Sequence, residues 1–204
     1  MKRNKPYIIG LTGGIASGKS NIAKALVREG AYVIDADRIS RALTQPGGAA
    51  LPLLRERFGN GIFDGGALNR KRFGDQVFAD KESLKALNAI LHPMILAEIR
   101  RKIDAHRELA ALVMDVPLLY EVGWDSMCDE VWCAYAPFFE QVFRLMRRDE
   151  HSFLQALRRV RAQLPLCKKC RRADHYIDTR GTKENSARQA IMLWQDALRR
   201  ARGG

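Results

Sequence analysis

The stretch GLTGGIASGKS, residues 10–20, decides the fold of this chain. Gly13, four further residues, Gly18, Lys19 and Ser20 fit the pattern G-x-x-x-x-G-K-[ST]. The backbone N–H groups of such a loop converge on phosphate oxygens, and the lysine and hydroxyl groups add further contacts. The stretch therefore predicts a binding site for phosphate groups.

The residues on either side of the loop support this interpretation. An apolar, β-branched run at 7–12 precedes it and predicts a short buried strand. Residues 21–29 follow with apolar side chains at helical spacing, and Gly30 is placed to end that helix. The order strand, loop, helix directs a helix N-terminus, with its unpaired N–H groups, at the anion. The alternative is a glycine-rich turn that binds nothing, and both flanks disfavour it.

A loop of this kind predicts a nucleotide as the ligand. We expect Lys19 to reach the β- and γ-phosphates of ATP, and the Ser20 hydroxyl to ligate Mg²⁺. The residues expected to bind the nucleotide are Gly13, Gly14, Ile15, Ala16, Ser17, Gly18, Lys19 and Ser20.

Length and composition indicate one globular α/β domain. The chain has 204 residues, of which 47% are hydrophobic and 28% charged, which is ordinary for such a domain. No apolar run approaches the roughly 20 residues of a membrane span. Residues 1–6 are basic and polar and leave no room for the apolar core of a signal peptide. We therefore expect a cytoplasmic protein without a membrane partner.

The positive charge is concentrated in one segment. The net charge is +12, and the segment from Arg144 to Arg172 holds ten Lys or Arg residues against Asp149 and Glu150 alone. Such a run is usually a solvated face. In a protein that binds phosphates it can instead form a lid over them, and we expect anionic partners in either case.

The four cysteines do not indicate a disulfide framework in a chain of this size and compartment. Cys167 and Cys170 have the C-x-x-C spacing of half a zinc site, with His175 five residues further on. Cys128 and Cys133 do not supply a second pair at metal spacing. Incidental thiols are therefore the favoured interpretation over a metal site.

Short apolar runs alternate with helical patterns along the rest of the chain. This alternation predicts an α/β fold of the P-loop kinase type, with a five-stranded parallel sheet flanked by helices. Beyond the first strand and helix, we expect strands at 31–34, 109–114, 130–136 and 176–178, and helices at 138–148, 152–163 and 182–202. The two helices at 138–148 and 152–163 should meet near Asp149 and Glu150, a possible N-cap region.

Residues 38–107 have a mainly helical pattern that is too long for a plain crossover between strands. The pattern is interrupted by His92-Pro93, where we expect a helix break. We therefore expect a single kinase unit with a helical insertion. Its parts are a core of residues 1–37, 108–137 and 173–204, an insertion of residues 38–107 that binds the acceptor, and a helical lid of residues 138–172.

Carboxylates at the ends of the predicted strands are candidates for the chemistry. A kinase needs a group that takes or orients the proton of the acceptor hydroxyl. Asp35 and Asp37 point to opposite sides if the second strand extends that far, so only one can face the transferred phosphate. Asp37 is favoured because it lies nearer the exit of the strand, and the alternative is that both residues cap the next helix. Asp115, after the third strand, is placed for a magnesium-associated acid.

Arginines of the basic segment are the candidates for stabilising the transferred phosphoryl group. Arg144 and Arg148 are four residues apart and share one helical face, and Arg159 and Gln163 share a face on the next helix. The alternative for each is a solvated basic surface. His92 is favoured as an ordinary histidine at a helix break over a catalytic base.

Taken together, these stretches closely resemble those of dephospho-coenzyme A kinases, over most of the chain from near residue 7 to near 180. The phosphate loop alone is shared by a vast superfamily, and the other stretches are more discriminating. The matching stretches are residues 11–20, Val-Ile-Asp-Ala-Asp at 33–37, Leu-His-Pro at 91–93, Pro-Leu-Leu-Tyr-Glu at 117–121, Arg148-Asp149 with Gln163 downstream, and Ala-Asp-His-Tyr-Ile-Asp at 173–178.

The resemblance implies transfer of phosphate from ATP to the ribose 3′-hydroxyl of dephospho-coenzyme A, the last step of coenzyme A synthesis. It also implies a core, a helical coenzyme-binding domain and a lid. By resemblance, Asp37 matches the proposed base, Thr12 lies near the transferred phosphate, and Arg144 and Arg148 match lid arginines. We expect Asp37, Lys19, Arg144 and Arg148 to be catalytic, and Thr12, Asp37, His92, Leu119, Glu121, Arg159 and Gln163 to bind the substrate.

Two positions depart from the family pattern. Ala16 replaces the usual glycine of the loop, which should be tolerable if its φ is negative. Thr179 and Arg180 follow Asp178 where the family more often has Asp-Asn and then glycine, which affects the expected contacts with adenine.

Two other functions are weighed against this one. A P-loop kinase of another nucleoside or small alcohol shares the loop and the lid but not the more discriminating stretches. A nucleic-acid-binding ATPase is suggested by the charge, but the basic segment lacks the interleaved aromatic residues of a stacking platform. We expect no nucleic-acid partner, and a monomer or weak homo-oligomer.

Overall fold

The computed structural model describes residues 5–203, apart from the side chains of residues 78 and 79. The chain divides into two compact units, one formed by Met1–Ile34 with His106–Gly204 and the other by Asp35–Ala105. The basic residues 1–4 at the start lie outside the described part. No helix in the described part is long and apolar enough to cross a membrane.

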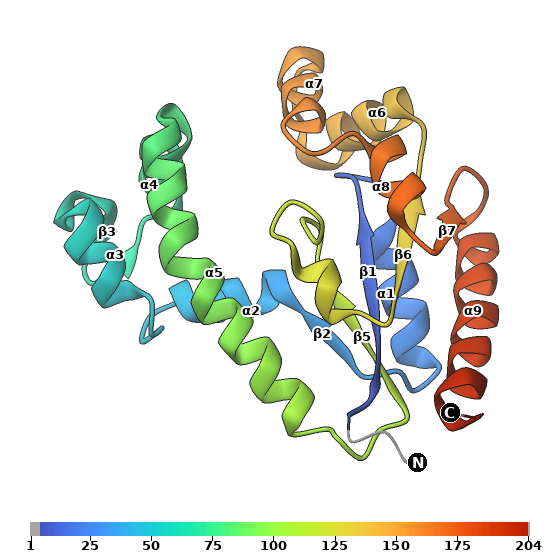
Figure 1. Cartoon of the computed structure of the whole chain (residues 1–204). Helices are drawn as coiled ribbons and strands as arrows, with labels where there is room; N and C mark the ends of the chain where they lie inside the picture. Colours follow the sequence, from blue (N-terminus) through green and yellow to red (C-terminus); the bar gives the residue numbers. More distant parts are fainter. Residues whose placement is uncertain (1–4, 204) are drawn as a thin grey trace. The chain divides into compact units, whose positions relative to one another are not determined.

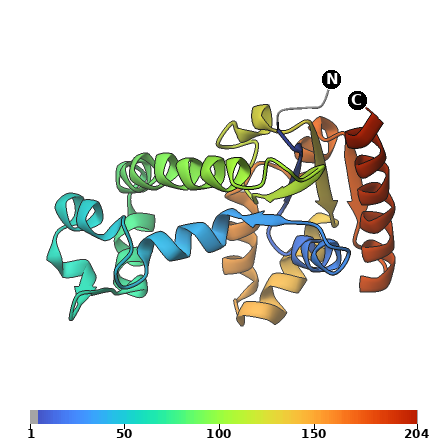
Figure 2. The same cartoon turned by 90° about the horizontal axis from the view of Figure 1, so that it is seen from below.

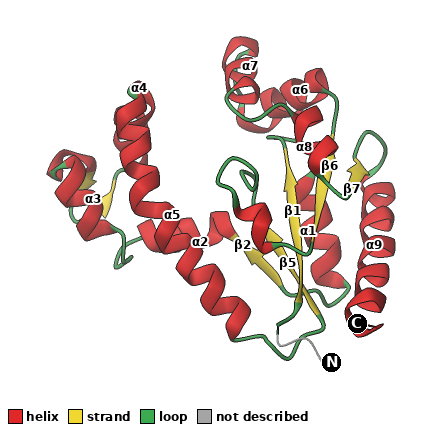
Figure 3. Cartoon of the chain, in the orientation of Figure 1, coloured by secondary structure: helices red, strands yellow, loops and turns green. Residues whose placement is uncertain are grey.

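The first unit is built on a five-stranded sheet in the order β2-β5-β1-β6-β7 (Figure 3). Strand β1 pairs in parallel with β5 and with β6, and β6 pairs in parallel with β7. The predicted fold class is therefore confirmed. The strands are β1 Tyr7–Gly13, β2 Val33–Asp35, β5 Ala111–Asp115, β6 Glu130–Tyr135 and β7 His175–Asp178.

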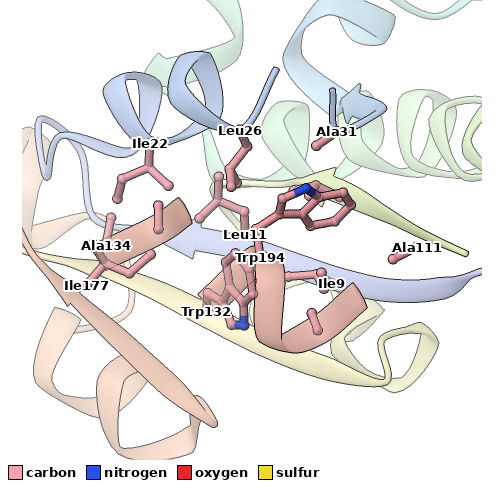
Figure 4. Close-up of a cluster of buried hydrophobic side chains, with 13 residues drawn as sticks. Ile9, Leu11, Ile22, Leu26, Ala31, Ala111, Trp132, Ala134, Ile177 and Trp194 are labelled. Carbon is pink, nitrogen blue, oxygen red and sulfur yellow. The ribbon is translucent and has the colours of Figure 1, made fainter. Parts of the chain in front are cut away.

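Helices α1 Lys19–Arg28 and α9 Lys183–Gly203 pack together over one face of this sheet. Figure 4 shows the core between them, where Ile22 and Leu26 of α1 and Trp194 of α9 meet Leu11 and Trp132 of the strands. All five side chains are buried. This core holds the end of β1 and the start of α1 in place, and the loop of residues 14–18 spans the gap between them.

The other face of the sheet is covered by the segment after β5 and by helix α8, Leu166–Arg172. The contact is close at Gly10 of β1, where a Cβ atom would lie 2.6 Å from Cys128 Sγ and 2.8 Å from Leu119 Cδ2. The segment contains a short helical turn, η2 Trp124–Met127. The sequence does not predict α8 as a separate helix, because its residues fall in the basic segment and show no clear apolar period.

Helices α6 Phe138–Asp149 and α7 Phe153–Arg161 follow β6 and pack on each other (Figure 1). The prediction of an N-cap at Asp149 or Glu150 was wrong. Ser152 caps α7 in a capping box with Gln155, because its hydroxyl is a good acceptor for the first free N–H groups. Glu150 instead ends α6 with a φ of 53°.

The second unit consists of four α-helices, one short 3₁₀ turn and a two-stranded antiparallel hairpin. Its longest helix, α5, packs against the other three, and Figure 2 shows α5 in yellow-green beside α2 in blue. The elements are α2 Ala36–Thr44, α3 Leu51–Phe58, η1 Asn60–Ile62, β3 Phe63–Asp64, β4 Ala67–Leu68, α4 Arg70–Ala79 and α5 Lys81–Asp104.

The predicted helix break at His92-Pro93 was wrong, because α5 runs through Pro93 without interruption. A proline inside a helix removes one hydrogen bond and crowds the preceding turn. The apolar face continues on both sides of it, with Leu91 before the proline and Ile95 and Ile99 after it, all buried. Packing of that face outweighs the local cost of the proline.

Candidate active site

The phosphate loop connects β1 to α1 and leaves the start of the helix open. Gly18 precedes α1 with a φ of 86°, and no described side chain caps the helix there. Gly18 therefore needs a conformation that favours glycine. The N–H groups of Lys19 and Ser20, at the start of the helix, remain available to an anion, whereas that of Asn21 donates to Gly18 O at 3.0 Å.

Two further glycines of the loop are required by close contacts. A Cβ atom on Gly13 would lie 2.5 Å from Ser17 Oγ, and one on Gly14 would lie 2.2 Å from Gln141 Oε1. Ser17 Oγ is buried and has no hydrogen-bond partner among the described residues. The loop is thus compact and retains both backbone and side-chain polar groups for a ligand.

Ala16 has a φ of 56°, in the left-handed region. From the sequence, we expect a Cβ atom there to be tolerated on the condition that φ is negative. The structure does not meet that condition. A left-handed conformation costs a non-glycine residue roughly 1–2 kcal/mol. The loop of this chain therefore carries backbone strain where a glycine would carry little.

Lys19 forms an ion pair with Asp115 at the end of β5. The two side chains are only 14% and 7% exposed. Asp115 lies opposite Leu11 in the sheet, so the pairing of β5 with β1 carries its carboxylate to the loop. Ser20 is exposed in the first turn of α1. Lys19, Ser20 and Asp115 fit the groups that a nucleotide and its magnesium ion require.

Lys169 of α8 is fully buried beside the loop, which the sequence analysis did not foresee. Its ammonium group is 2.8 Å from Glu121 Oε1, donates to Pro117 O at 2.7 Å and lies 3.5 Å from Gly13 O. Pro117 O also accepts from the Thr12 hydroxyl at 3.0 Å. One buried cation therefore joins α8, the end of β1 and the segment after β5.

Glu121 and Gln163, both predicted to bind the substrate, are occupied by contacts within the protein. Glu121 accepts from Leu164 N at 3.1 Å in addition to its ion pair with Lys169. Gln163 Oε1 accepts from Ile15 N at 2.7 Å, at the tip of the loop. The two residues thus tie the connection between α7 and α8 to the phosphate loop.

Thr179 is a second residue whose importance the sequence did not reveal. Its buried hydroxyl lies 2.8 Å from Ser17 O and 2.9 Å from Tyr135 O, and it accepts from Arg144 Nη1 at 3.0 Å. Arg144 also pairs with Glu140. Thr179 therefore links the loop, the end of β6 and a candidate lid arginine through one oxygen atom.

The remaining predicted residues of the first unit lie in two different environments. Arg148 is bound to its neighbour Asp149 by two hydrogen bonds of 2.7 and 2.9 Å, which hold the pKa of that carboxyl below its usual value. Arg159 is exposed on α7. Leu119 is fully buried and packs on the sheet at Gly10.

A cavity of about 370 Å³ adjoins the loop at Gly14. Its walls come from the end of β6, from α6 and from the connection between α7 and α8, with Tyr135, Phe138 and Leu166 among the lining residues. The walls are largely apolar, as in most sites for flat organic groups.

In the second unit, Asp35 and Asp37 differ in role. The condition that the strand extends through both is not met, because β2 ends at Asp35 and α2 begins at Ala36. Asp35 caps α2, accepting from Arg38 N at 2.9 Å. Asp37 lies exposed in the first turn and is not used as a cap. His92 is half-buried, and burial lowers its pKa.

The cysteines are free thiols. Cys170 of α8 lies 3.4 Å from Cys133 of β6, and this contact together with burial raises the pKa of Cys133. Cys167 is exposed. No group of three or more His, Cys, Asp or Glu side chains in the described part of the chain is arranged to hold a metal ion.

Comparison with known sequences identifies relatives along most of the chain. A family model described as dephospho-CoA kinase matches residues 7–185. A dephospho-CoA kinase of Carboxydothermus hydrogenoformans is 43% identical over 194 residues, which cover 92% of this chain and 93% of the relative. One of Symbiobacterium thermophilum is 44% identical over 193 residues, covering 93% of this chain and 81% of the relative.

Solved structures give the same picture of the fold. A crystal structure of the Thermus thermophilus protein TT1252 has a TM-score of 0.81 at 32% identity and covers 94% of this chain and 98% of its own. A dephospho-CoA kinase from Campylobacter jejuni has a TM-score of 0.63 at 24% identity, covering 94% and 97% of the two chains. A shikimate kinase from Acinetobacter baumannii, at 0.55 and 17%, covers 97% and 96% and shares the fold alone.

Proposed function

Because the chain belongs to the dephospho-CoA kinase family and is a kinase, we propose that it phosphorylates the ribose 3′-hydroxyl of dephospho-coenzyme A with ATP. The single observation that carries the donor half is the uncapped start of α1 behind a compact loop, in which a Cβ atom on Gly13 or Gly14 would lie 2.5 or 2.2 Å from a side-chain oxygen. The choice of dephospho-coenzyme A as the acceptor rests on the membership of this chain in the family.

The donor is bound by residues of the first unit. The N–H groups of Lys19 and Ser20 at the start of α1 point to the phosphates, and Lys19 leaves Asp115 to neutralise charge on the β- and γ-phosphates. The Ser20 hydroxyl, together with Asp115, would hold a magnesium ion, which would supply neutralisation of the phosphate charge. The adenine base of ATP occupies the apolar cavity beside Gly14.

The acceptor is activated by Asp37. Its exposed carboxylate takes the proton of the 3′-hydroxyl as the ribose oxygen bonds to the γ-phosphorus. The bond from that phosphorus to the β,γ-bridging oxygen breaks, and ADP leaves with the electron pair. The products are ADP and coenzyme A.

The lid arginines stabilise the charge that spreads over the transferred phosphoryl oxygens. Arg144 is the better placed of the two, because Thr179 connects it to the carbonyl of Ser17 in the loop. Arg148 must first leave Asp149. Gln163 holds the connection between α7 and α8 on the loop through Ile15.

The experiment measures ADP formation by the purified protein with Mg·ATP and a series of acceptors. Dephospho-coenzyme A should give ADP together with coenzyme A, identified by its 3′-phosphate in NMR, while adenosine and simple alcohols should give far less. ADP formation that does not depend on an acceptor, or equal rates with all acceptors, would contradict the proposal.

A matched pair of variants tests whether Asp37 is the general base. Asp37→Asn should lower kcat by about 10²- to 10⁴-fold, the usual contribution of general-base catalysis, with ATP binding unchanged. Asp35→Asn removes a carboxylate two residues away but keeps the cap, because asparagine caps helices as well as aspartate does. It should retain activity, and full activity of Asp37→Asn would exclude this role.

A further inference from the structure

Two thiols meet where helix α8 packs on strand β6, on the face of the sheet opposite α1 and α9. Cys133 Sγ and Cys170 Sγ are 3.4 Å apart, although the two residues are 37 positions apart in the chain. Trp132 and Ala134, the neighbours of Cys133 along β6, belong to the core beneath α1 and α9. Side chains alternate along a strand, so Cys133 points to the other face, where α8 lies.

The two thiols differ in their access to solvent and in their acidity. Cys133 is fully buried, whereas Cys170 is partly exposed. Contact with Cys133 lowers the pKa of the Cys170 thiol, which favours the thiolate, the form that reacts with oxidants. Thiols that respond to oxidation typically combine an accessible sulfur of lowered pKa with a second thiol within reach. Cys170 and Cys133 fit these two roles.

Both sulfur atoms belong to segments that hold the phosphate loop. Cys170 directly follows Lys169, whose buried ammonium group lies 3.5 Å from Gly13 O. Cys133 lies opposite Thr12 in the pairing of β6 with β1. A covalent bond between the two sulfurs therefore acts on the end of β1, where the loop begins.

We propose that Cys133 and Cys170 are an oxidation site, at which hydrogen peroxide forms a disulfide bond that weakens the binding of ATP at the loop. Formation of the bond does not depend on the proposed function, whereas its effect on the site rests on it. Disulfide sulfurs are about 2.05 Å apart, so the two atoms must approach by about 1.4 Å. Such a shift of α8 against β6 is large beside the range of a good hydrogen bond, and a close-packed interior does not absorb it. The contacts of Lys169 with the loop are therefore disturbed.

The chemistry balances with peroxide as the oxidant. The Cys170 thiolate attacks one oxygen of the peroxide, the O–O bond breaks, and hydroxide leaves with the electron pair. The Cys133 sulfur then attacks the sulfur of the sulfenic acid on Cys170 and gives up its proton, and water leaves. Two thiols have been oxidised to a disulfide, and one peroxide molecule has been reduced to water. A dithiol such as dithiothreitol reverses the change by thiol–disulfide exchange.

The first measurement identifies the bond. The reduced protein is treated with hydrogen peroxide, its remaining thiols are blocked with N-ethylmaleimide, and its peptides are analysed by mass spectrometry. A digest that cuts before Asp129 and after Lys168 separates all four cysteines from one another. The expected product is a peptide pair that joins Cys133 to Cys170 and separates on reduction. A bond that includes either of the other two cysteines, or oxidation of Cys170 to a sulfinic acid without a bond, would overturn the proposal.

The second measurement is the Kd for Mg·ATP, determined by calorimetry without an acceptor. Oxidation should raise this Kd about fivefold or more, as expected from the loss of one hydrogen bond, and dithiothreitol should restore it. Cys170→Ser and Cys133→Ala should each abolish the response to peroxide. Cys167→Ser, at an exposed thiol of the same helix, should keep it.

These variants keep the test decisive. If Cys133→Ala does not fold, Cys170→Ser at a partly exposed position is sufficient on its own. An unchanged Kd for Mg·ATP in fully disulfide-bonded protein would overturn the proposal, as would an undiminished response in Cys170→Ser. Failure of the proposed function is separate, because the reduced wild-type protein would then form no coenzyme A while the mapped bond and the ATP affinity are still measured.

Discussion

The phosphate-loop end of the first unit and the cavity of the second unit are built from different interactions. Around the loop, single buried polar atoms such as Lys169 Nζ and Thr179 Oγ1 contact several segments at once. Around the cavity between α2, α4 and α5, lined by Leu68, Phe73 and Val77 among others, the walls are mostly apolar, and a long contact of 3.4 Å joins Arg70 to Thr44. Phosphates have the same shape in every nucleotide and suit a fixed polar frame, whereas an apolar group is selected by the size and shape of a space. Substitutions at the loop should therefore act through lost polar contacts.

The largest effect on stability is expected from breaking the buried ion pair of Glu121 and Lys169. Glu121→Met leaves the fully buried ammonium group without its carboxylate and should lower the free energy of unfolding by about 3–5 kcal/mol. Lys169→Met leaves Glu121, whose side chain is 24% exposed and still accepts from Leu164 N, so its loss should be smaller. Urea unfolding of both variants measures the difference. Equal losses would mean that the ammonium group is hydrated.

Thr179 tests whether one hydroxyl group supports both the loop and Arg144. Thr179→Val keeps the shape but removes the hydroxyl group, so the partners of a buried oxygen lose a contact, at about 1–3 kcal/mol. KM for ATP should rise with the loss of stability. Thr179→Ser keeps the oxygen and should restore most of both quantities. If Thr179→Ser lost stability and Thr179→Val did not, the packing of the methyl group near Gly18 rather than the hydrogen bonds would be responsible.

Ala16 offers a smaller change of opposite sign. Ala16→Gly relieves the left-handed strain but adds freedom to the unfolded chain, so the net gain in stability should be roughly 1 kcal/mol or less. The same substitution at Ala89, exposed in the interior of α5, should cost about 1 kcal/mol. Thermal unfolding of the two variants should therefore shift in opposite directions. A loss of stability in Ala16→Gly would show that the alanine is not strained.

The sequence predicted the frame of the first unit because its signals are local. The loop, the strands of the sheet and helices α6, α7 and α9 follow from a motif and from apolar periodicity, and their bounds agree with the structure to within a few residues. Helix α8 has seven residues, too few for a clear period within a basic segment. Its buried positions, Leu166 and Lys169, do have a helical spacing of three.

The sequence does not predict which groups particular buried side chains contact. Lys169 is buried and Lys168 is exposed, yet composition makes them equivalent. Only the fold brings Glu121 beside one of them, across 48 positions of the chain. The same holds for Thr179, whose contacts with Ser17 and Tyr135 depend on the pairing of β6 with β7. At His92-Pro93, a local rule for proline was outweighed by packing of the apolar face of α5.

The smallest effect is expected from His92 in the second unit, and it depends on pH. Burial lowers the pKa of His92 in the folded protein, so the unfolded chain binds its proton more readily. Stability from this residue is therefore complete above the unfolded value of about 6.5 and is lost as pH falls through the lowered pKa of the folded state. His92→Gln should remove this part of the pH dependence. Urea unfolding at a series of pH values between about 7 and 5 should show the stability of the wild-type falling relative to that of His92→Gln toward the acidic end, because only the wild-type loses stability through this group. Parallel curves would mean that His92 titrates alike in both states.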